Sequence, residues 1–338
     1  MSCRSETRTA MILTMETGKG LNEPIGTAPT VLLEEPGHTR IAELLLTEAG
    51  PDDVVIDIDW SGISSGTERM LWAGTMPAFP GLAYPLVPGY ESVGRVVWAG
   101  ESSERTVGDT VFVPGARCHE GAAALFGATS SRLVVPSSRS VPVRAEWGAN
   151  ATLLALAATA HHALAAPHAA APELIVGHGV LGRLLARLTI ALGHDVPTVW
   201  ERQEARHDGA IGYAVLHPNQ DKRSDYRSLY DVSGDNAVLD TLVVRSAKGA
   251  EIVLAGFYGA PVQFAFPPAF MRETRIRIAA EFTPADIAAV IALLETGALS
   301  LDGLVTHREA ATSVANAYAT AFGDPLCLKM ILDWRDAR

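Results

Sequence analysis

Short apolar runs alternate with polar turns through the first part of the chain, from Thr30 to about Val143. Gly, Pro, Ser and Asp separate these runs, and such spacing is typical of a small barrel-like β domain. The clearest predicted strands are Val54–Asp59, Ser92–Val97, Thr110–Val113 and Arg132–Val135. We therefore predict an all-β fold for this part of the protein.

The pattern changes at Ala151, where a helix rich in Ala and Leu is predicted to run to Ala166. Strands and helices alternate after it, with strands predicted near 173–177, 196–200, 213–216, 229–232, 251–255 and 276–281. This alternation predicts a parallel sheet with right-handed crossovers. The link between the second and third of these strands is short for a full helix, so we expect a trimmed layer there.

Two helices and a strand are predicted near the C-terminus. Thr283 as N-cap and proline at the first helical position favour a helix over Pro284–Glu295. A second helix is predicted over Glu309–Phe322, and Leu326–Leu332 is predicted to return as a strand to the β domain.

The resulting domain plan has three parts. Residues 1–27 are mostly polar, lack the long apolar core of a secretory signal, and are expected to form a poorly ordered extension. Residues 28–150 together with 296–338 form the β domain, and residues 151–295 form the α/β domain.

A glycine motif lies at the centre of the α/β part. Gly177, Gly179 and Gly182 have the spacing G-x-G-x-x-G, and they follow a short apolar strand. This spacing allows a tight turn, the approach of a pyrophosphate, and close packing of a helix on a strand. Leucines at helical spacing follow, so Val180 and Leu181 open a helix whose N-terminus favours a phosphate.

The second strand of this unit ends in an acid. Glu201 lies nineteen residues after Gly182, where a carboxylate can accept both hydroxyls of an adenine ribose. Because a carboxylate repels a 2′-phosphate, the sequence favours NAD over NADP, although Arg202 stands beside the acid. Strand, glycines, helix, strand and acid in this order predict a dinucleotide site.

Length, net charge and cysteine content exclude several classes of protein. The 338 residues suffice for two domains, and a net charge of −11 without a basic block argues against nucleic acid and against an anionic membrane surface. The apolar stretch 151–171 holds three histidines and a proline, so it is predicted to be a core helix and no membrane span. Cys3, Cys118 and Cys327 are too far apart for a disulfide framework, which favours a reducing cytoplasm.

Several stretches together resemble the medium-chain dehydrogenase/reductase superfamily, which includes zinc alcohol dehydrogenases and zinc-free quinone reductases. They are Trp60–Glu68, Pro85–Glu91, Val107–Phe112, the glycine motif and Leu304–Arg308, in the superfamily's order. The resemblance covers roughly residues 30–335. It implies an α/β protein with a GroES-like β-barrel domain and a Rossmann dinucleotide-binding domain.

Longer strings are similar to the branch of that superfamily that oxidises a hydroxyethyl group on a bacteriochlorophyllide or chlorophyllide in bacteriochlorophyll biosynthesis. They are Trp60–Trp72, Met76–Gly81, Tyr84–Ser92, Val113–Cys118, Leu254–Tyr258 and Phe264–Met271. The resemblance implies a chlorin macrocycle as substrate, with a nicotinamide cofactor as the hydride acceptor. It also implies that Thr159, Leu181 and Gly256 border the nicotinamide.

The residues that bind zinc in the zinc members of the superfamily are replaced here. Ser64 follows Gly-Ile where those members have Cys, and Tyr90 stands in Gly-Tyr-Glu where they have Gly-His-Glu. Ala155 begins the segment that matches their third ligand. Because a neutral hydroxyl is a poor zinc ligand, we predict a zinc-free enzyme. The alternative zinc site would use Cys118, His119 and Glu91.

Without zinc, side chains of the protein must accept the proton of the substrate's hydroxyl group and stabilise the alkoxide that develops on it. The candidate catalytic residues are Tyr90, Ser64, Thr67, Glu68, Glu91 and His161. Glu91 is either a base or a salt-bridge partner of an arginine, and His161 with His162 is either a relay or ordinary helix packing. Several aromatic residues are candidates for a wide pocket or for plain core: Trp72, Phe79, Tyr84, Phe257, Phe264, Phe266 and Phe270.

Three functions fit these residues. The first is a soluble NAD-dependent alcohol dehydrogenase acting on a chlorin, the second is a zinc-free quinone or enone reductase using NADPH, and the third is a pigment carrier without catalysis. The oligomeric state stays open, with a homo-oligomer among the options.

Overall fold

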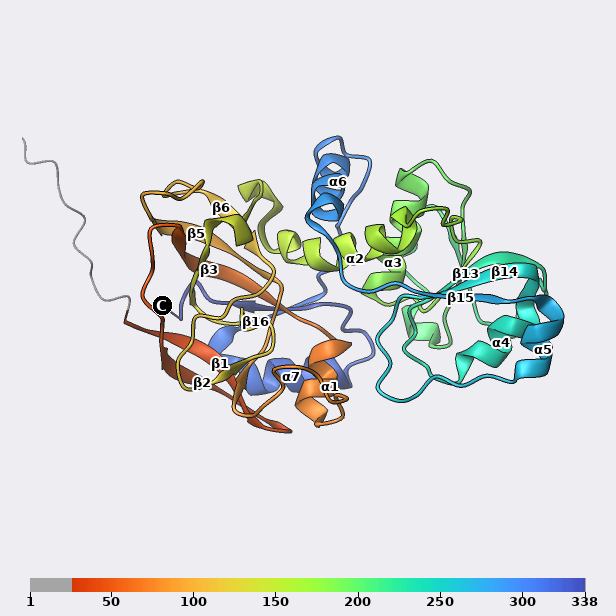
Figure 1. Cartoon of the computed structure of the whole chain (residues 1–338), viewed down its shortest axis with the longest axis horizontal. Helices are drawn as coiled ribbons and strands as arrows, with labels where there is room; N and C mark the ends of the chain where they lie inside the picture. Colours follow the sequence, from red (N-terminus) through yellow and green to blue (C-terminus); the bar gives the residue numbers. More distant parts are fainter. Residues whose placement is uncertain (1–25, 338) are drawn as a thin grey trace, which may run out of the picture.

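The computed structural model describes residues 26–337, which form two halves side by side (Figure 1). One half holds two β-sheets, and the other holds a parallel sheet with helices on both of its faces. The prediction for residues 1–27 falls almost entirely outside the described residues. The predicted domain boundaries stay a prediction.

The larger sheet of the β half is built around β3 (Asp53–Ile63). Its order is β16-β17-β3-β5-β6-β9, and β8 also pairs with β3. Val54, Ile56 and Ile58 of β3 are fully buried, so this strand is the axis of the β core. The other strands are β5 (Ser92–Ala99), β6 (Thr110–Val113), β8 (Arg132–Pro136), β9 (Val141–Pro142), β16 (His307–Ala310) and β17 (Met330–Asp333). The four strands predicted for this half are confirmed.

A smaller sheet completes the β half, with the order β2-β1-β4-β7. Its strands are β1 (Thr27–Glu35), β2 (His38–Leu45), β4 (Leu86–Val87) and β7 (Ala123–Ala124). One helix, α1 (Thr67–Ala73), interrupts the predicted all-β region. Its seven residues are too few to produce a recognisable apolar period, and it buries Glu68 and Leu71.

The C-terminal segment returns to the β half, as predicted. β17 pairs antiparallel with β3, where Met330 faces Ile63, and β16 runs parallel beside β17. The helix predicted over Glu309–Phe322 was wrong at its start. Glu309 and Ala310 belong to β16, and a 3₁₀ turn over Ala311–Ser313 leads into α7 (Val314–Gly323).

The α/β half has a six-stranded sheet in the order β12-β11-β10-β13-β14-β15, with every neighbouring pair parallel. All six predicted strands are present: β10 (Leu174–Val176), β11 (Thr198–Trp200), β12 (Ala214–Leu216), β13 (Tyr226–Asp231), β14 (Ser246–Leu254) and β15 (Arg275–Ile278). Between β11 and β12 there is only a 3₁₀ turn, Glu204–Arg206, so the expected trimmed layer is confirmed.

Alternate residues of each strand point to opposite faces of the sheet, and both faces carry apolar residues that helices cover. Ile175 packs into one core with α2 (Leu154–Ala165), α3 (Val180–Ala191) and α6 (Pro284–Glu295). Leu174 and Val176 pack into another core with α4 (Val238–Arg245) and α5 (Phe266–Arg272). Figure 1 shows α2 and α3 lying between the two sheet systems, with α4 and α5 on the far side.

Local capping also follows the sequence. Thr283 caps α6 by accepting a hydrogen bond from the backbone N–H of Asp286, whose carboxylate accepts in return from the backbone N–H of Thr283. This reciprocal capping box confirms the predicted start of the helix. Within residues 26–337 no helix is long and apolar enough to span a bilayer.

Candidate active site

A cleft of about 1400 Å³ lies between the two halves and is lined by residues of both. It opens at the carboxyl ends of the parallel strands, since Gly177 directly follows β10, Glu201 directly follows β11 and Gly256 lies two residues after β14. Ligands of open α/β sheets bind at this edge. All the predicted cofactor residues line the cleft: Gly177, Gly179, Val180, Leu181, Gly182, Glu201, Arg202, Thr159 and Gly256.

The glycine motif forms the turn between β10 and α3. Gly177 has a φ of 103°, a conformation that L side chains rarely adopt. A Cβ at Gly182 would lie 1.8 Å from the Gly177 carbonyl oxygen, so helix and strand pack too closely for any other residue. A Cβ at Gly179 would meet nothing within 4 Å, so the backbone at the start of α3 is open toward the cleft.

The Glu201 carboxylate is held at the edge of the cleft by two backbone groups. Its Oε2 accepts a hydrogen bond from His178 N at 3.0 Å, and its Oε1 accepts from Gln203 N at 2.8 Å. Arg202 turns to Asp235, with 3.0 Å between its guanidinium and the Asp235 carboxylate. Part of the positive charge beside Glu201 is thereby offset.

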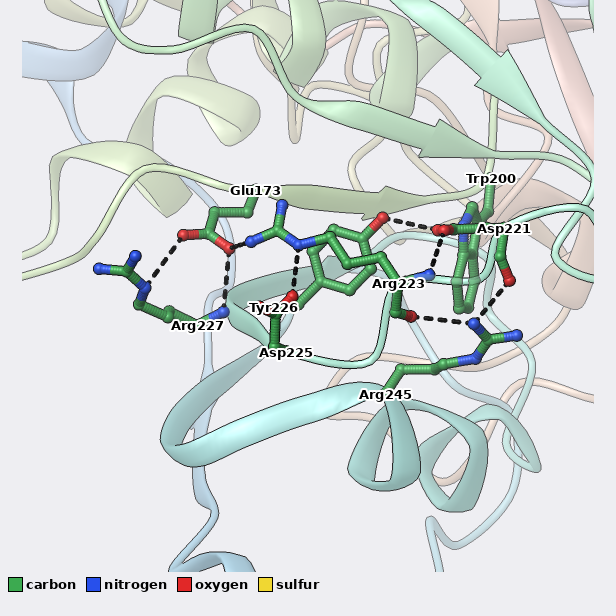
Figure 2. Close-up of polar contacts among 8 residues, drawn as sticks. All are labelled: Glu173, Trp200, Asp221, Arg223, Asp225, Tyr226, Arg227 and Arg245. Atoms are coloured by element: carbon green, nitrogen blue, oxygen red, sulfur yellow. Dashed lines mark hydrogen bonds and ion pairs between the residues drawn. The ribbon is translucent and has the colours of Figure 1, made fainter.

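A polar network behind β11 fixes the residue that precedes Glu201 (Figure 2). Asp221 Oδ2 accepts from the Trp200 indole at 2.8 Å and from the Tyr226 hydroxyl at 2.6 Å. Burial opposes the charged form of Asp221, but these hydrogen bonds outweigh it and lower the pKa of the carboxyl. Arg245 donates to the backbone oxygens of Asp221 and Arg223, so the loop that carries Asp221 is tied to α4.

A second buried acid supports the loop at Gly256. The backbone oxygen of Asp231 accepts hydrogen bonds from Ala255 N at 2.9 Å and Gly256 N at 3.1 Å. The Asp231 carboxylate accepts from the Tyr258 hydroxyl and from Ser233 N. These contacts hold Gly256 at the cleft, which Thr159 of α2 also lines.

The β half contributes a pair of hydroxyl groups. The Tyr90 hydroxyl donates to Ser64 Oγ at 2.7 Å, and both residues line the cleft together with Thr67. The ring of Phe126 packs edge-on against Tyr90, with the centroids 4.9 Å apart. Burial and the charge of Glu91 raise the pKa of the Tyr90 phenol, so its neutral form, a hydrogen-bond donor, is favoured.

Glu68 lies directly behind this pair and is fully buried. Its Oε1 accepts from Ser64 N at 3.3 Å, and its Oε2 accepts from the Tyr318 hydroxyl at 2.8 Å. Burial raises the pKa of Glu68 to about 7; the Tyr318 hydrogen bond opposes this rise, and the charge of Glu91 adds to it. Glu68 does not line the cleft, so it can act on a ligand only through Ser64 and its neighbours.

Glu91 forms an ion pair with Lys329, and both side chains are almost completely buried. Burial raises the pKa of Glu91, while the Lys329 ammonium opposes the rise. Gly62 is required beside them, since a Cβ there would lie 2.2 Å from Glu91 Oε2. Of the two readings of Glu91, the geometry favours the salt bridge, with a lysine of the C-terminal segment as the partner.

His161 lies away from the hydroxyl pair and does not line the cleft. Its Nδ1 is 2.8 Å from Asp286 Oδ1, and Nδ1 of His162 is 2.9 Å from the other oxygen of the same carboxylate. Burial disfavours the charged form of Asp286, but hydrogen bonds from Thr283 and both histidines outweigh it and lower the pKa of the carboxyl. This arrangement joins α2 to α6 and favours the packing role.

The alternative zinc site is not assembled. Cys118 Sγ lies 3.9 Å from His119 Nδ1, but across residues 26–337 no group of three or more His, Cys, Asp or Glu side chains is placed to hold a metal ion. Burial raises the pKa of Cys118 to about 11 and lowers the pKa of His119 to about 4. Zinc independence stays a prediction that rests on the replaced ligands.

The aromatic candidates divide into separate groups. Phe79 and Phe257 line the cleft, whereas Phe264, Phe266 and Phe270 surround a separate exposed groove beside α5. Trp72 packs against Phe322 within the β half. Only two of the seven aromatic candidates therefore line the cleft.

Two partners of the candidate acids, Lys329 and Tyr318, were not among the residues predicted from the sequence. Lys329 is the only charged residue in the apolar stretch Leu326–Leu332. A single cation in such a stretch indicates a buried partner of opposite charge. Tyr318 gave no such signal, because a tyrosine on the buried face of a helix is ordinary.

Comparison with known proteins identifies the family. A sequence profile of the alcohol dehydrogenase GroES-like domain matches residues 50–168. The chain is 58% identical over 294 residues to the 2-desacetyl-2-hydroxyethyl bacteriochlorophyllide A dehydrogenase of Rhodobacter capsulatus, covering 87% of this chain and 94% of that one. It is 54% identical over 310 residues to the protein of the same name from Cereibacter sphaeroides, covering 90% and 98%. The chain belongs to the family of these two dehydrogenases.

The fold of the chain matches that of a solved alcohol dehydrogenase. A crystal structure of an alcohol dehydrogenase from E. coli CFT073 in complex with NADH superposes with a TM-score of 0.77 at 20% identity, covering 91% of this chain and 99% of that one. The predicted GroES-like and Rossmann architecture is confirmed. The chain thus has the fold of that alcohol dehydrogenase, whose crystal structure holds the nicotinamide cofactor NADH.

The residues present in this family member fit such a cofactor. The open backbone at Gly179 leaves room for a pyrophosphate at the N-terminus of α3. The Glu201 carboxylate is held at the end of β11, where a ribose diol of the cofactor would lie.

Proposed function

We propose that this protein oxidises the 1-hydroxyethyl group of a bacteriochlorophyllide or chlorophyllide to an acetyl group, with NAD as the hydride acceptor, in bacteriochlorophyll biosynthesis. The observation that carries the proposal is the identity of 58% and 54% to two dehydrogenases of that substrate over nearly their whole lengths. The carbinol carbon loses a hydride and its hydroxyl loses a proton, leaving a ketone and reduced cofactor.

The protein's own residues hold the cofactor in this proposal. The Gly179 backbone and the start of α3 receive the pyrophosphate, and Glu201 receives the adenine ribose. Thr159, Leu181 and Gly256 border the nicotinamide, which accepts the hydride when bound. NAD is favoured over NADP because Glu201 would repel a 2′-phosphate and because Arg202 is paired with Asp235.

Tyr90 and Ser64 handle the substrate hydroxyl. Because their hydroxyls are 2.7 Å apart at the cleft, a carbinol oxygen beside them can pass its proton to one hydroxyl while the pair releases another proton to water in the cleft. The raised pKa of the Tyr90 phenol keeps it neutral, so it retains the hydrogen that it donates to Ser64. Thr67 lies beside them, while Glu68 and Glu91 set the charge behind them. We propose that no zinc takes part, because the superfamily's ligand positions hold Ser64, Tyr90 and Ala155.

We also propose the cytoplasm as the compartment, since Cys118 and Cys327 are free buried thiols.

One incubation tests the function. Purified protein is mixed with NAD and a hydroxyethyl chlorin that bears a free carboxyl group, and the absorbance of NADH and of the pigment is followed. Simultaneous NADH formation and conversion of the pigment to its acetyl form support the proposal. Binding of the pigment without turnover would indicate a carrier, and turnover only of a quinone or enone with NADPH would indicate a reductase.

A further inference from the structure

The N-terminal part of the β half, from Ser64 to Arg139, lines the cleft with arginines and with no acidic residue. Between Ser64 and Arg139, the lining residues include Arg69, Arg117 and Arg139 but neither aspartate nor glutamate. The whole chain carries a net charge of −11, so this wall is opposite in sign to the rest of the protein. A cleft lined by one sign of charge attracts a ligand of the other sign.

Two of these arginines are next in the chain to residues linked to the Tyr90–Ser64 pair. Arg69 follows Glu68 directly on α1, and Glu68 is bonded to Ser64 N. Arg117 follows Ala116, whose N–H donates to the Phe126 carbonyl at 2.7 Å. Phe126 in turn packs on the Tyr90 ring, and both arginines line the same cleft as the pair.

Both side chains are available to a ligand. Arg69 and Arg117 are exposed, and among residues 26–337 neither has a hydrogen bond or an ion pair. The arginines at the nucleotide end are already engaged, since Arg202 pairs with Asp235 and Arg206 donates to the Pro325 carbonyl at 2.7 Å. A free guanidinium fits a carboxylate with two parallel hydrogen bonds.

We propose that Arg69 and Arg117 bind a free carboxylate on the macrocyclic substrate and thereby select the acid over its ester. This inference rests on the proposed function. A chlorophyllide differs from a chlorophyll in that its propionate side chain is not esterified, so the otherwise apolar macrocycle carries one carboxylate. The apolar Met76 and Phe79 line the same wall and suit the face of the macrocycle, while the arginines orient it by its anionic edge.

The experiment compares the hydroxyethyl chlorin acid with its methyl ester in steady-state kinetics. The variants are Arg69→Gln, Arg117→Gln and both together, with Arg117→Lys to test rescue by charge. Arg40→Gln is the matched control, because Arg40 is an exposed arginine of the same half whose partner is Glu34, outside the cleft. Far-ultraviolet circular dichroism and the midpoint of urea unfolding establish that each variant is folded.

We expect the wild type to prefer the acid and each single glutamine variant to raise the KM for the acid about tenfold, as for the loss of one charged hydrogen bond. The kcat for the acid and the kinetics of the ester should change little, and the double variant should no longer distinguish the two. Arg117→Lys should recover part of the preference, and salt should weaken it in the wild type.

Two results would overturn the carboxylate role while leaving the proposed function intact. One is an undiminished preference for the acid in the double variant, which would mean that the ester is rejected by shape. The other is a raised KM for NAD with an unchanged KM for the pigment, which would assign the arginines to the cofactor. If the wild type turned over neither pigment, the proposed function would fail and the carboxylate role with it.

Discussion

Glu68→Gln is expected to remove a pH-dependent cost from the stability of this protein. A glutamate that titrates at 4.5 in the unfolded chain titrates at about 7 when buried here. The folded state therefore binds this proton more tightly than the unfolded state does. Stability from this source is complete below pH 4.5 and is lost as the pH rises toward 7.

The size of the effect follows from the two pKa values. Each pH unit between them costs about 1.4 kcal/mol, so the full loss is about 3 kcal/mol above pH 7. Glutamine is nearly isosteric with glutamate, and its amide oxygen can still accept the hydrogen bond that the Tyr318 hydroxyl donates. Because an amide does not ionise, the variant should gain stability relative to the wild type as the pH rises from 5 to 8.

Urea unfolding followed by tryptophan fluorescence at pH 5, 6, 7 and 8 measures this difference. The buried Trp334 in the β half is a suitable reporter. Glu43→Gln, at an exposed position on β2, is the matched control for losing one carboxylate. A difference between variant and wild type that is flat with pH, or that falls as the pH rises, would refute the reasoning about Glu68.

The remaining predictions concern cofactor, proton and metal. The double substitution Glu201→Ala with Arg202→Ser should weaken the binding of NAD by about 1–3 kcal/mol, as measured by titration. Equal turnover of the wild type with NADP would contradict the predicted preference for NAD. Tyr90→Phe should lower kcat about 10²–10⁴-fold with little change in the KM for the pigment. His161→Asn, at a residue that does not line the cleft, should retain most of the wild-type kcat. The reverse result would assign the proton relay to His161 on α2. Elemental analysis should find no stoichiometric zinc and chelators should leave turnover unchanged, whereas one bound zinc per chain would contradict this.

The fold could be predicted from local patterns to an unusual extent. The strands at β10 and β11 and the glycines between them are set by apolar runs and turn residues that lie within about thirty positions of one another. The capping box at Thr283 is likewise a contact over three residues. Such features are legible because the residues that interact are also neighbours in the sequence.

Contacts over long sequence separations could not be predicted in the same way. Tyr318 and Glu68 are 250 positions apart, and His161 and Asp286 are 125 apart. The spacing of apolar residues does not determine which helix packs beside which loop. Glu68 and His161 could therefore be predicted as candidates, but their partners could not. The partner bears on the role of each residue, since the contact with Asp286 favours a packing role for His161 and the Tyr318 hydroxyl holds Glu68 behind Ser64.

The charges behind the hydroxyl pair follow from those partners. Lys329 forms an ion pair with Glu91, and the charge of Glu91 still raises the pKa of the Tyr90 phenol. Glu68 has a hydroxyl as its hydrogen-bond partner, and burial raises its pKa to about 7. The charge of Glu68 behind Ser64 therefore changes near neutral pH. A negative charge there favours the departure of a proton toward the pair and opposes an alkoxide beside it. The pH profile of kcat in Glu68→Gln should accordingly lose any inflection that this carboxyl contributes, while Tyr90→Phe should lower the profile without flattening it.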